Sequence, residues 1–533
     1  MQVRLLLFLI FFSVQLFAQQ FFLPLGRDYL TSFDGSVNKL SSNFHSSFKP
    51  YLQSKISNYD SLTDYSTRYA SFIDKRKYKW IWKDLFNKRF ITIRSEDFSM
   101  DIDPLMNICI GKDLTDSAGG LLYNNTRGIQ VQGGIGKKFS FYSNFYENQS
   151  AFLPYITNFV NQSQVVPGEG WVKPFKETGF DYAIASGYVS YTPNKYFNFQ
   201  FGHGKNFVGD GYRSLLLSDN AFNYPFLKIT STFWHFQYTN LYASFMDLRE
   251  PHSYEEGFKK KLASFNYLSW IVNKRIHVGL FEGIIWQASD STGAGGFNVN
   301  YFNPIILFRP IQYSLSSSNN ALIGLNAKVK ILDNMHVYGQ LVLDDININS
   351  LKNGYLQNKN GFQVGMRWFN LVLKTLNLQL EYNQVRPYTY AQESSVQNYS
   401  HYNQSLTHPL GANFREGLVF VQYRYKNIFV ELKTSYAVYG ADTNNSNWGK
   451  DIFLSDNTAQ NGFLSYGNSI AQGVKTVLSY KDIRVAYLIN PVTNLNLIAG
   501  FSYRTQVSSI ETQKSNYVYF GIATNLTNRY HDF

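Results

Sequence analysis

The sequence predicts an all-β fold: one transmembrane outer-membrane antiparallel β-barrel of about 16–18 strands, with a small, partly helical N-terminal periplasmic plug element. Three observations lead to this prediction. Apolar and polar residues alternate from about Phe98 onward, the last alternating run leads to the aromatic residue Phe533, and residues 1–18 have the features of an export signal. A large secreted β-sandwich or lectin array is the alternative fold.

The start of the chain predicts export. Arg4 precedes an apolar run at residues 5–12, and Ala18 precedes the expected cleavage point, which is the order found in signal peptides. Gln19 stands where a lipid-anchored protein would carry cysteine, so no lipid anchor is expected. We therefore divide the chain into a signal peptide at 1–18, an N-terminal periplasmic or plug segment at 19–95, and the barrel at 96–533.

The clearest strand covers residues 376–383. Its apolar members are Leu376, Leu378, Leu380 and Tyr382, and its polar members are Asn377, Gln379, Glu381 and Asn383. Because successive side chains of a strand point to opposite faces, the first set is expected to face lipid and the second to face the lumen. A helix would scatter both sets around its axis. Similar runs occur at 129–132, 139–141, 197–201 and 495–497.

The lengths of the connections predict a meander. Short turns at 192–195, 332–334 and 426–427 separate neighbouring runs, as expected at the periplasmic end of such a barrel. Longer polar stretches at 388–416 and 441–465 are predicted to be extracellular loops. Roughly 440 residues, at ~10 residues per strand plus unequal loops, give the strand number stated above.

Composition agrees with this fold. Aromatic residues make up 17% of the chain, with 40 Tyr and 45 Phe, which suits aromatic girdles at the two membrane interfaces. After the signal there is no apolar stretch of ~18 residues, so no transmembrane helix is expected. The single cysteine, Cys109, excludes an internal disulfide and is interpreted as a small apolar strand residue.

The formal net charge is 49 − 37 = +12. A positive balance favours anionic partners, here lipid phosphate, lipopolysaccharide or acidic polysaccharide. General surface solubility explains the charge at least equally well. Nucleic acid is not an expected partner, because the chain is predicted to be exported.

Residues 19–95 differ from the rest, because alternation is weak there. Tyr65, Tyr69 and Phe72 have helical spacing, and residues 77–90 are predicted as a second short helix with a basic and an apolar side. We favour a plug at the periplasmic mouth of the barrel for this segment. Contact with lipid headgroups is the alternative.

Enzyme signatures are not found. The glycine pair in 202–205 lacks the strand-to-helix context of a phosphate loop, and no nucleophile elbow occurs. Carboxylate pairs exist, but nothing in the sequence fixes the separation that glycoside hydrolysis needs. We therefore expect a protein that is not an enzyme and has no cofactor.

The first polar segment of interest covers residues 201–220. Glycines interrupt its alternation and would let it fold back tightly, into the lumen. Its donors, acceptors and aromatic face form a mixture that suits sugars: His203, Lys205, Asp210, Tyr212, Arg213 and Asp219. The alternative is a loop whose polar groups pair only with each other.

A second segment, residues 303–313, has two prolines around a short apolar run. Proline blocks ladder hydrogen bonds, so this segment is predicted to be an edge or a bent constriction loop. Arg309 is its only charge and is a candidate for pointing into the pore. A structural use is favoured over binding.

The third segment, residues 385–416, is rich in aromatic, amide and imidazole groups that suit stacking and hydrogen bonding to a sugar ring. Its candidate residues are Arg386, Tyr388, His401, Tyr402, Asn403, Gln404, His408 and Asn413. Two histidines seven residues apart lack a third metal ligand, so no metal is expected. A luminal network that satisfies itself is the competing interpretation.

These segments resemble the Wzi family of capsule-assembly outer-membrane barrels, and within it the gliding-motility RemB-type branch. The stretches that carry the resemblance are 22–27, 202–220, 303–310, 340–345, 386–390, 401–404 and 408–414. The resemblance implies a barrel of about 18 strands with a helical plug at its periplasmic end. It also implies a lectin-like role in holding capsular polysaccharide, and for the gliding branch a link to surface motility, adhesins and type IX secretion.

The predicted function is therefore non-enzymatic: binding or anchoring of capsular or exopolysaccharide at the cell surface, with a role in gliding motility as an extension. Expected partners are that polysaccharide, outer-membrane lipid, and gliding or secretion machinery proteins. The two loops at 202–220 and 388–416 are predicted to meet near the barrel mouth, with tyrosines stacking on sugar rings and cations pairing with acidic groups. The predicted contacts are Tyr212, Tyr388, Tyr402, Lys205, Arg213 and Arg386. A scaffold subunit of a secretion or motility complex, a diffusion channel and an outer-membrane enzyme are the alternatives.

Overall fold

The computed structural model describes residues 20–56, 88–116, 119–249, 257–288, 303–306, 320–345, 353–394, 396–443, 446–457, 464–524 and 527–533. Three predictions fall outside these residues: the signal peptide, the helical spacing at 65–73 and most of the predicted helix at 77–90. Arg309 also lies outside them. Within the described residues, no helix is long and apolar enough to cross a membrane.

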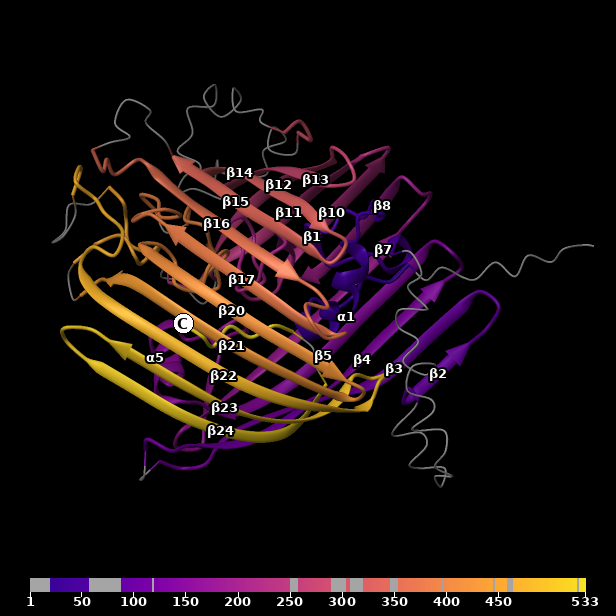
Figure 1. Cartoon of the computed structure of the whole chain (residues 1–533), viewed down its shortest axis with the longest axis horizontal. Coiled ribbons are helices and arrows are strands. Elements are labelled where there is room, and N and C mark those ends of the chain that lie inside the picture. Colours follow the sequence, from indigo (N-terminus) through magenta and orange to yellow (C-terminus); the bar gives the residue numbers. More distant parts are fainter. Residues whose placement is uncertain are drawn as a thin grey trace, which may run out of the picture.

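Antiparallel strands close into a barrel (Figure 1). Eighteen of the described strands form the ring, which confirms the upper end of the predicted range. Closure comes from the last strand, which pairs with the first through Tyr517 opposite Asp113. Because a closed ring has no free edge, every strand has a hydrogen-bonding neighbour on both sides, as a membrane interior requires.

The strands of the ring are β3 (Phe98–Asp113), β4 (Leu122–Ile135), β5 (Phe139–Ala151), β7 (Gly179–Tyr191), β8 (Phe197–Gly204), β10 (Tyr224–Phe233), β11 (Phe236–Asp247), β12 (Lys259–Ile271), β13 (Ile276–Gln287), β14 (Asn320–Leu332), β15 (Met335–Asp345), β16 (Lys359–Trp368), β17 (Leu376–Val385), β20 (Phe414–Tyr425), β21 (Ile428–Ala441), β22 (Val474–Asn490), β23 (Leu495–Val507) and β24 (Thr512–Thr524). Smaller elements are α1 (Arg27–Val37), α5 (Pro154–Ser163), the 3-10 helix η1 (Gln53–Lys55), β1 (Phe48–Lys49), β2 (Ile91–Arg94), β6 (Lys173–Phe175), β9 (Phe207–Val208), β18 (Ser400–His401) and β19 (Gln404–Ser405).

Side chains alternate between the two faces of the wall as predicted. In β17, Gln379, Glu381 and Asn383 are buried inside the barrel, whereas Leu380 is exposed on the outer face. At the short turn between β10 and β11, Trp234 is 82% exposed, which suits an aromatic girdle at the membrane interface. The period-two pattern therefore identified the two faces of this strand correctly.

The predicted short turns are confirmed, and they lie at one end of the barrel. Only residues 426–427 separate β20 from β21, and Lys426 has a φ of 52°, as a tight hairpin turn requires. The turns at 192–196 and 333–334 join β7 to β8 and β14 to β15. Longer connections lie at the opposite end, which marks that end as extracellular and the short-turn end as periplasmic.

The N-terminal segment lies inside the barrel, where α1 is bound to the inner wall. Asp34 of α1 pairs with Arg367 of β16 (2.7 Å), and Asp28 pairs with Arg484 of β22 (2.5 Å). The sequence patterns did not identify α1. In addition, β2 pairs with β3 although it falls within the segment assigned to the plug. The boundary between residues 95 and 96 stays a prediction.

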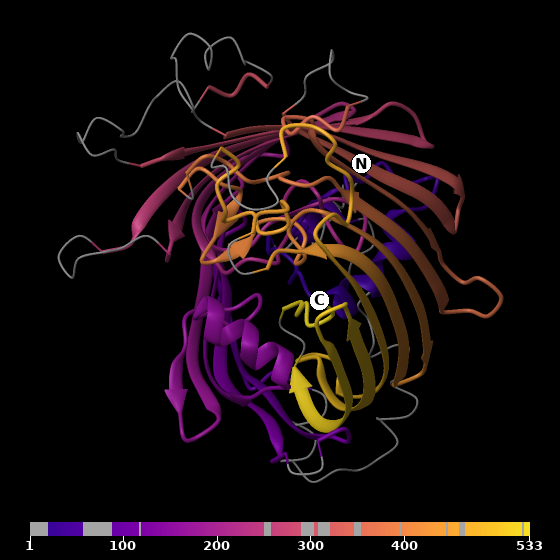
Figure 2. The same cartoon turned by 90° about the vertical axis from the view of Figure 1, so that its left-hand side faces the viewer.

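The C-terminus corrects one sequence observation. The last strand ends at Thr524, so Phe533 does not lie on it. Residues 527–533 instead turn into the lumen, and Figures 1 and 2 both place the C-terminus inside the barrel. There, Arg504 of β23 donates to the carbonyl oxygen of Phe533 (2.9 Å), and the hydroxyl of Tyr155 donates to that of His531 (2.6 Å). The terminal aromatic residue is thus part of the luminal filling.

Candidate functional site

The connection between β8 and β10, residues 205–223, folds into the barrel. Val208 N donates to the carbonyl of Leu217 (2.8 Å), and Gly209 N donates to Ser47 in the N-terminal segment (2.7 Å). Gly209 has a φ of 144°, and a Cβ there would lie 2.5 Å from the side-chain amide nitrogen of Gln340. Only glycine fits this backbone, which confirms that glycine lets the loop fold back into the lumen.

The carboxylate of Glu381 on β17 anchors this loop to the wall. It accepts hydrogen bonds from the backbone N–H groups of Tyr212 (2.7 Å) and Arg213 (3.0 Å), and from the hydroxyl of Tyr338 (2.8 Å). A buried carboxylate needs such donors because it has lost its water. The polar face of β17 therefore serves to hold the loop.

Arg213 lies at the centre of a buried ionic network and is 1% exposed. Its guanidinium donates twice to Glu416 of β20 (2.8 and 3.2 Å) and lies 3.1 Å from Asp532 of the C-terminal tail. His408 contacts the same Glu416 carboxylate (2.7 Å). The network joins the loop at 205–223, the loop at 386–413, the wall and the tail.

The charges in this network also fix protonation states. Burial by itself would raise the pKa of Asp532, but the charges of Arg213 and Lys433 outweigh it and hold that pKa below its usual range. Burial lowers the pKa of His408, against the opposing charge of Glu416, so its imidazole is neutral at neutral pH. The positive charge of Arg213 is therefore already balanced within the chain, by the carboxylates of Glu416 and Asp532.

The other acidic candidates of the first loop are also bound within the chain. Asp210 pairs with Lys328 of β14 (3.1 Å) and accepts from the hydroxyl of Ser47 (2.7 Å). Asp219 accepts from the hydroxyl of Tyr530 (2.6 Å) and from the side-chain amide of Asn528 (2.8 Å). The partners of both carboxylates lie in the wall, the N-terminal segment and the tail, so these groups are paired within the chain and not, as the alternative had it, with each other.

The stretch 388–416 was predicted to be an extracellular loop, and residues 388–413 do lie in the connection between β17 and β20 at the end of the barrel with the longer connections. Residues 414–416 belong to β20, and the preceding loop folds inward against the wall. Tyr388 is 1% exposed, and its hydroxyl donates to the carbonyl of Asn447 (2.9 Å). Apolar and aromatic side chains draw this loop into the barrel because burial removes their surface from water.

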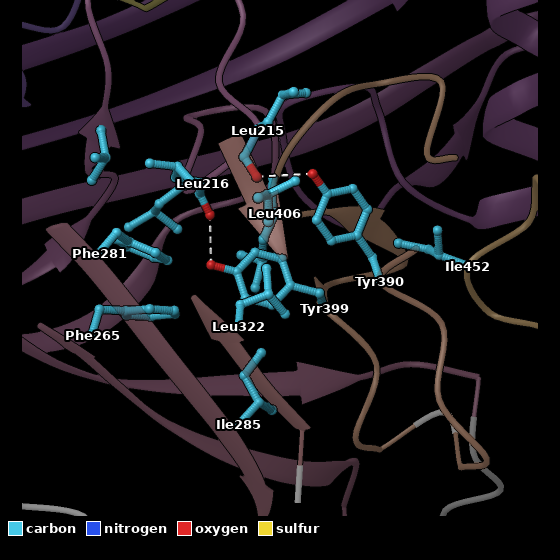
Figure 3. Packing of buried hydrophobic residues seen from close by; sticks show 14 of the residues in the cluster. Leu215, Leu216, Phe265, Phe281, Ile285, Leu322, Tyr390, Tyr399, Leu406 and Ile452 are labelled. Carbon is cyan, nitrogen blue, oxygen red and sulfur yellow. Dashed lines mark hydrogen bonds between the residues drawn. The ribbon is translucent and has the colours of Figure 1, made fainter. Parts of the chain in front are cut away.

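The two loops meet, as predicted, but in the interior. Figure 3 shows the hydroxyls of Tyr390 and Tyr399 donating to the carbonyls of Leu215 (2.8 Å) and Leu216 (2.6 Å). Phe265, on β12 of the wall, packs edge-on to Tyr399 at 6.1 Å. All of these residues belong to one buried apolar cluster, so the loops form a solid core with the wall.

The remaining buried candidates hold the second loop in place. His401 accepts a hydrogen bond from Met246 N (3.0 Å), and Asn413 donates to the carbonyls of Gly440 (3.1 Å) and Gln472 (3.0 Å). The guanidinium of Arg386, which is partly exposed, donates to the carbonyl of Asn358 (2.8 Å). These contacts are structural in the described conformation.

A smaller group of candidates comes together at the extracellular end and stays partly exposed. The ring of Tyr402 lies 4.8 Å from that of Phe222, and the imidazole of His203 lies 6.2 Å from Phe222. Asn403 donates to the carbonyl of Ser163 at the end of α5 (2.9 Å), while its side-chain oxygen has no hydrogen-bond partner within the described residues. We call His203, Phe222, Tyr402 and Asn403 the extracellular aromatic cluster.

Residues 163–172 after α5 border this cluster, and the sequence analysis did not identify them or Phe222. Gln404 accepts from Gly168 N (2.6 Å), and Lys205 donates to the carbonyl of the same glycine (2.5 Å). Burial lowers the pKa of Lys205 to about 8, against the opposing charges of Asp219 and Glu169. Pro154 at the first turn of α5 was an available signal for this helix.

A cavity of about 330 Å³ lies on another side of the lumen, between α1, α5, the C-terminal tail and strands β3, β4 and β21–β24. Cys109, Tyr517 and Tyr519 line it, together with the charged residues Arg27 and Glu431. Cys109 therefore borders the lumen, where its thiol donates to the side-chain oxygen of Asn107 (3.2 Å). In the described part of the chain, no group of three or more His, Cys, Asp and Glu side chains is placed to hold a metal ion.

Barrel closure, alternating faces and the filled lumen define an outer-membrane β-barrel. The chain is similar to the solved structure of Wzi from Escherichia coli, with a TM-score of 0.54 and 12% identity over 95% of this chain and 100% of that chain. Wzi is described as an outer-membrane protein involved in group 1 capsule assembly and as a carbohydrate-binding β-barrel. OprD from Pseudomonas aeruginosa has a TM-score of 0.43 with 9% identity over 82% of this chain and 96% of its own. A BenF-like porin from Pseudomonas fluorescens has a TM-score of 0.44 with 10% identity over 80% of this chain and 98% of its own. No protein-family model and no curated protein matches the chain.

Proposed function

We propose that this protein binds capsular or exopolysaccharide at the cell surface and holds it there without altering it chemically. The observation that carries the proposal is the extracellular aromatic cluster. Tyr402 and Phe222 are partly exposed neighbours at 4.8 Å, and the partly exposed imidazole of His203 lies 6.2 Å from Phe222. Aromatic faces stack on the C–H face of a sugar ring, and imidazoles bond its hydroxyls.

Two further facts support retention. Two loops, the segment at residues 20–56 and the C-terminal tail fill much of the lumen, as expected of a barrel that holds a ligand at its mouth. The similar barrel of Wzi is itself described as carbohydrate-binding and as involved in capsule assembly. A gliding role, with motility or secretion proteins as partners, rests on the sequence resemblance to the RemB-type branch and stays a prediction.

The proposal moves the sugar contacts away from several predicted residues. Tyr212, Tyr388 and Arg213 are at most 7% exposed, and a buried side chain that already has its partners is not available to a polymer at the surface. The proposed contacts are His203 and Tyr402 of the predicted set, with Phe222 added, and Asn403 holds the loop against the end of α5.

The first test compares a deletion strain carrying the wild-type gene with one carrying Tyr402→Ala. Loss of one stacking ring should weaken binding by about 1 kcal/mol, which is several-fold in Kd. The ratio of cell-attached to released polysaccharide should fall while total synthesis stays constant. Tyr436→Ala is the matched control, because Tyr436 is 55% exposed on the outer face of β21.

The proposal fails if deleting the gene leaves the attached-to-released ratio unchanged. If deletion lowers the ratio but Tyr402→Ala behaves like Tyr436→Ala, the protein retains polymer through another surface. Steady conductance in planar bilayers would instead favour a diffusion channel.

A further inference from the structure

The luminal cavity between β3, β4 and β21–β24 contains a flat aromatic surface. Tyr517 and Tyr519 stand two residues apart on β24, and their rings stack with centroids 5.4 Å apart at 21°. A Cβ at Gly111 would overlap the ring of Tyr517, and one at Gly500 would overlap that of Tyr519. The two glycines thus let both rings lie against the wall, where the partly exposed tyrosines line the cavity.

The charged groups around these rings are balanced. Arg27 pairs with Glu431 (2.9 Å), and Arg484 pairs with Asp28 (2.5 Å). Lys433 lies 3.4 Å from Asp532, and Arg529 pairs with Glu169 (2.9 Å). Each cation has an acidic partner, so the lining offers no excess charge for an anion. It does offer donors and acceptors side by side, which a hydroxyl group can use at the same time.

The side chains of Arg27, Arg484 and His531 line the cavity. Each also holds a ring or guanidinium nitrogen that is enclosed and has no hydrogen-bond partner within the described residues. Because these nitrogens are themselves enclosed, they make the wall of the cavity polar without offering a contact to a ligand.

We infer that this cavity is an internal binding site for an uncharged sugar unit, which stacks on Tyr519 and Tyr517. Its volume of about 330 Å³ is near the lower limit of pockets that bind small molecules, ~300 Å³, and suits a mono- or disaccharide. The inference rests on the proposed function for its ligand class, but it places a second site inside the barrel, apart from the extracellular aromatic cluster.

The only cysteine of the chain gives a direct test, because Cys109 lines the cavity. The purified full-length protein in detergent is treated with a small maleimide, and the labelling rate of Cys109 is measured with maltose, N-acetylglucosamine or glucuronate present. At a sugar concentration about nine times Kd, occupancy should slow labelling about ten-fold. We expect slowing by the uncharged sugars and not by glucuronate.

Variants separate binding in the cavity from other effects. Tyr519→Ala should abolish the protection, and Tyr519→Phe should keep it because the ring remains. Tyr487→Ala is the matched control, since Tyr487 is 41% exposed on the outer face of β22. Cys109→Ser shows that the label reports this site, and labelling after denaturation shows that the thiol is intact.

The inference is overturned if no sugar slows labelling, if glucuronate alone does, or if Tyr519→Ala keeps the protection. It is also overturned if native Cys109 never reacts, because a cavity closed to a small maleimide is closed to a sugar. Tyr402→Ala should lower polymer retention by cells and leave Cys109 protection unchanged. Each proposal can therefore fail without the other.

Discussion

Along β10–β17 the lumen is packed solid by two loops, whereas along β3, β4 and β21–β24 the same barrel borders a cavity. On the packed side, tyrosine hydroxyls donate to loop carbonyls within one apolar cluster. On the cavity side, the inner wall carries paired charges and tyrosines with partly exposed rings. Apolar and polar residues alternate in the same way on both sides. The two sides differ in what lies against the inner face: packed loops on one side and an open cavity on the other.

The difference also separates two uses of charge. Arg213 is enclosed by Glu416 and Asp532 and links four segments of the chain. The ion pairs Arg27–Glu431 and Arg484–Asp28 instead join α1 to strands of the wall beside the cavity. Charge in the packed region therefore links segments of the filling, and charge beside the cavity makes its wall polar.

The largest effect is expected from Arg213→Ala, which leaves the buried carboxylate of Glu416 without its guanidinium and Asp532 with Lys433 alone. Breaking a buried pair in this way costs about 3–5 kcal/mol. Thermal unfolding in detergent should show a much lower midpoint than for wild type. Arg415→Ala is the control, because Arg415 is exposed and stands next to Glu416 on β20. An equal fall of the unfolding midpoint in both variants would contradict the role of the network.

A smaller effect should distinguish the two sides directly. Tyr399→Phe and Tyr155→Phe each remove a hydroxyl that donates to a carbonyl at 2.6 Å. On the packed side, Tyr399→Phe leaves the carbonyl of Leu216 without this donor, which should lower the free energy of unfolding by about 1–3 kcal/mol. Beside the cavity, water can replace the hydroxyl of Tyr155, so the loss of unfolding free energy should be smaller. Equal losses would contradict the contrast between the two sides.

The smallest effect is expected from mild acid. The pKa of Asp532 is lowered in the folded chain, so its carboxylate contributes stability above its unfolded pKa of about 3.9. That contribution is lost only as the pH falls from there toward the folded pKa. The tail should therefore stay docked between pH 7 and pH 5. Hydrogen exchange of residues 527–533, corrected for the intrinsic rates, should not change over that range. Release of the tail in that window would contradict the lowered pKa of Asp532 if Asp532→Asn abolished it. It would show that another group controls docking if Asp532→Asn kept it.

The sequence by itself determined the barrel, because period-two alternation and short turns are local properties of the chain. The faces of β17 and the hairpin at 426–427 follow from neighbouring residues alone. The same patterns also indicated which loops carry polar and aromatic groups. They misplaced Phe533, since an alternating strand does not reveal that the chain turns inward after Thr524.

Only the tertiary structure decided which of those groups are available. Tyr388, Tyr399 and Tyr402 come from one loop of similar composition, yet the first two are buried and the third is partly exposed. The cavity likewise joins Arg27, Cys109 and Tyr519, which are far apart in sequence. The physical reason is that burial and charge pairing depend on contacts between distant segments, and these contacts exist only once the barrel has closed around its own loops and ends.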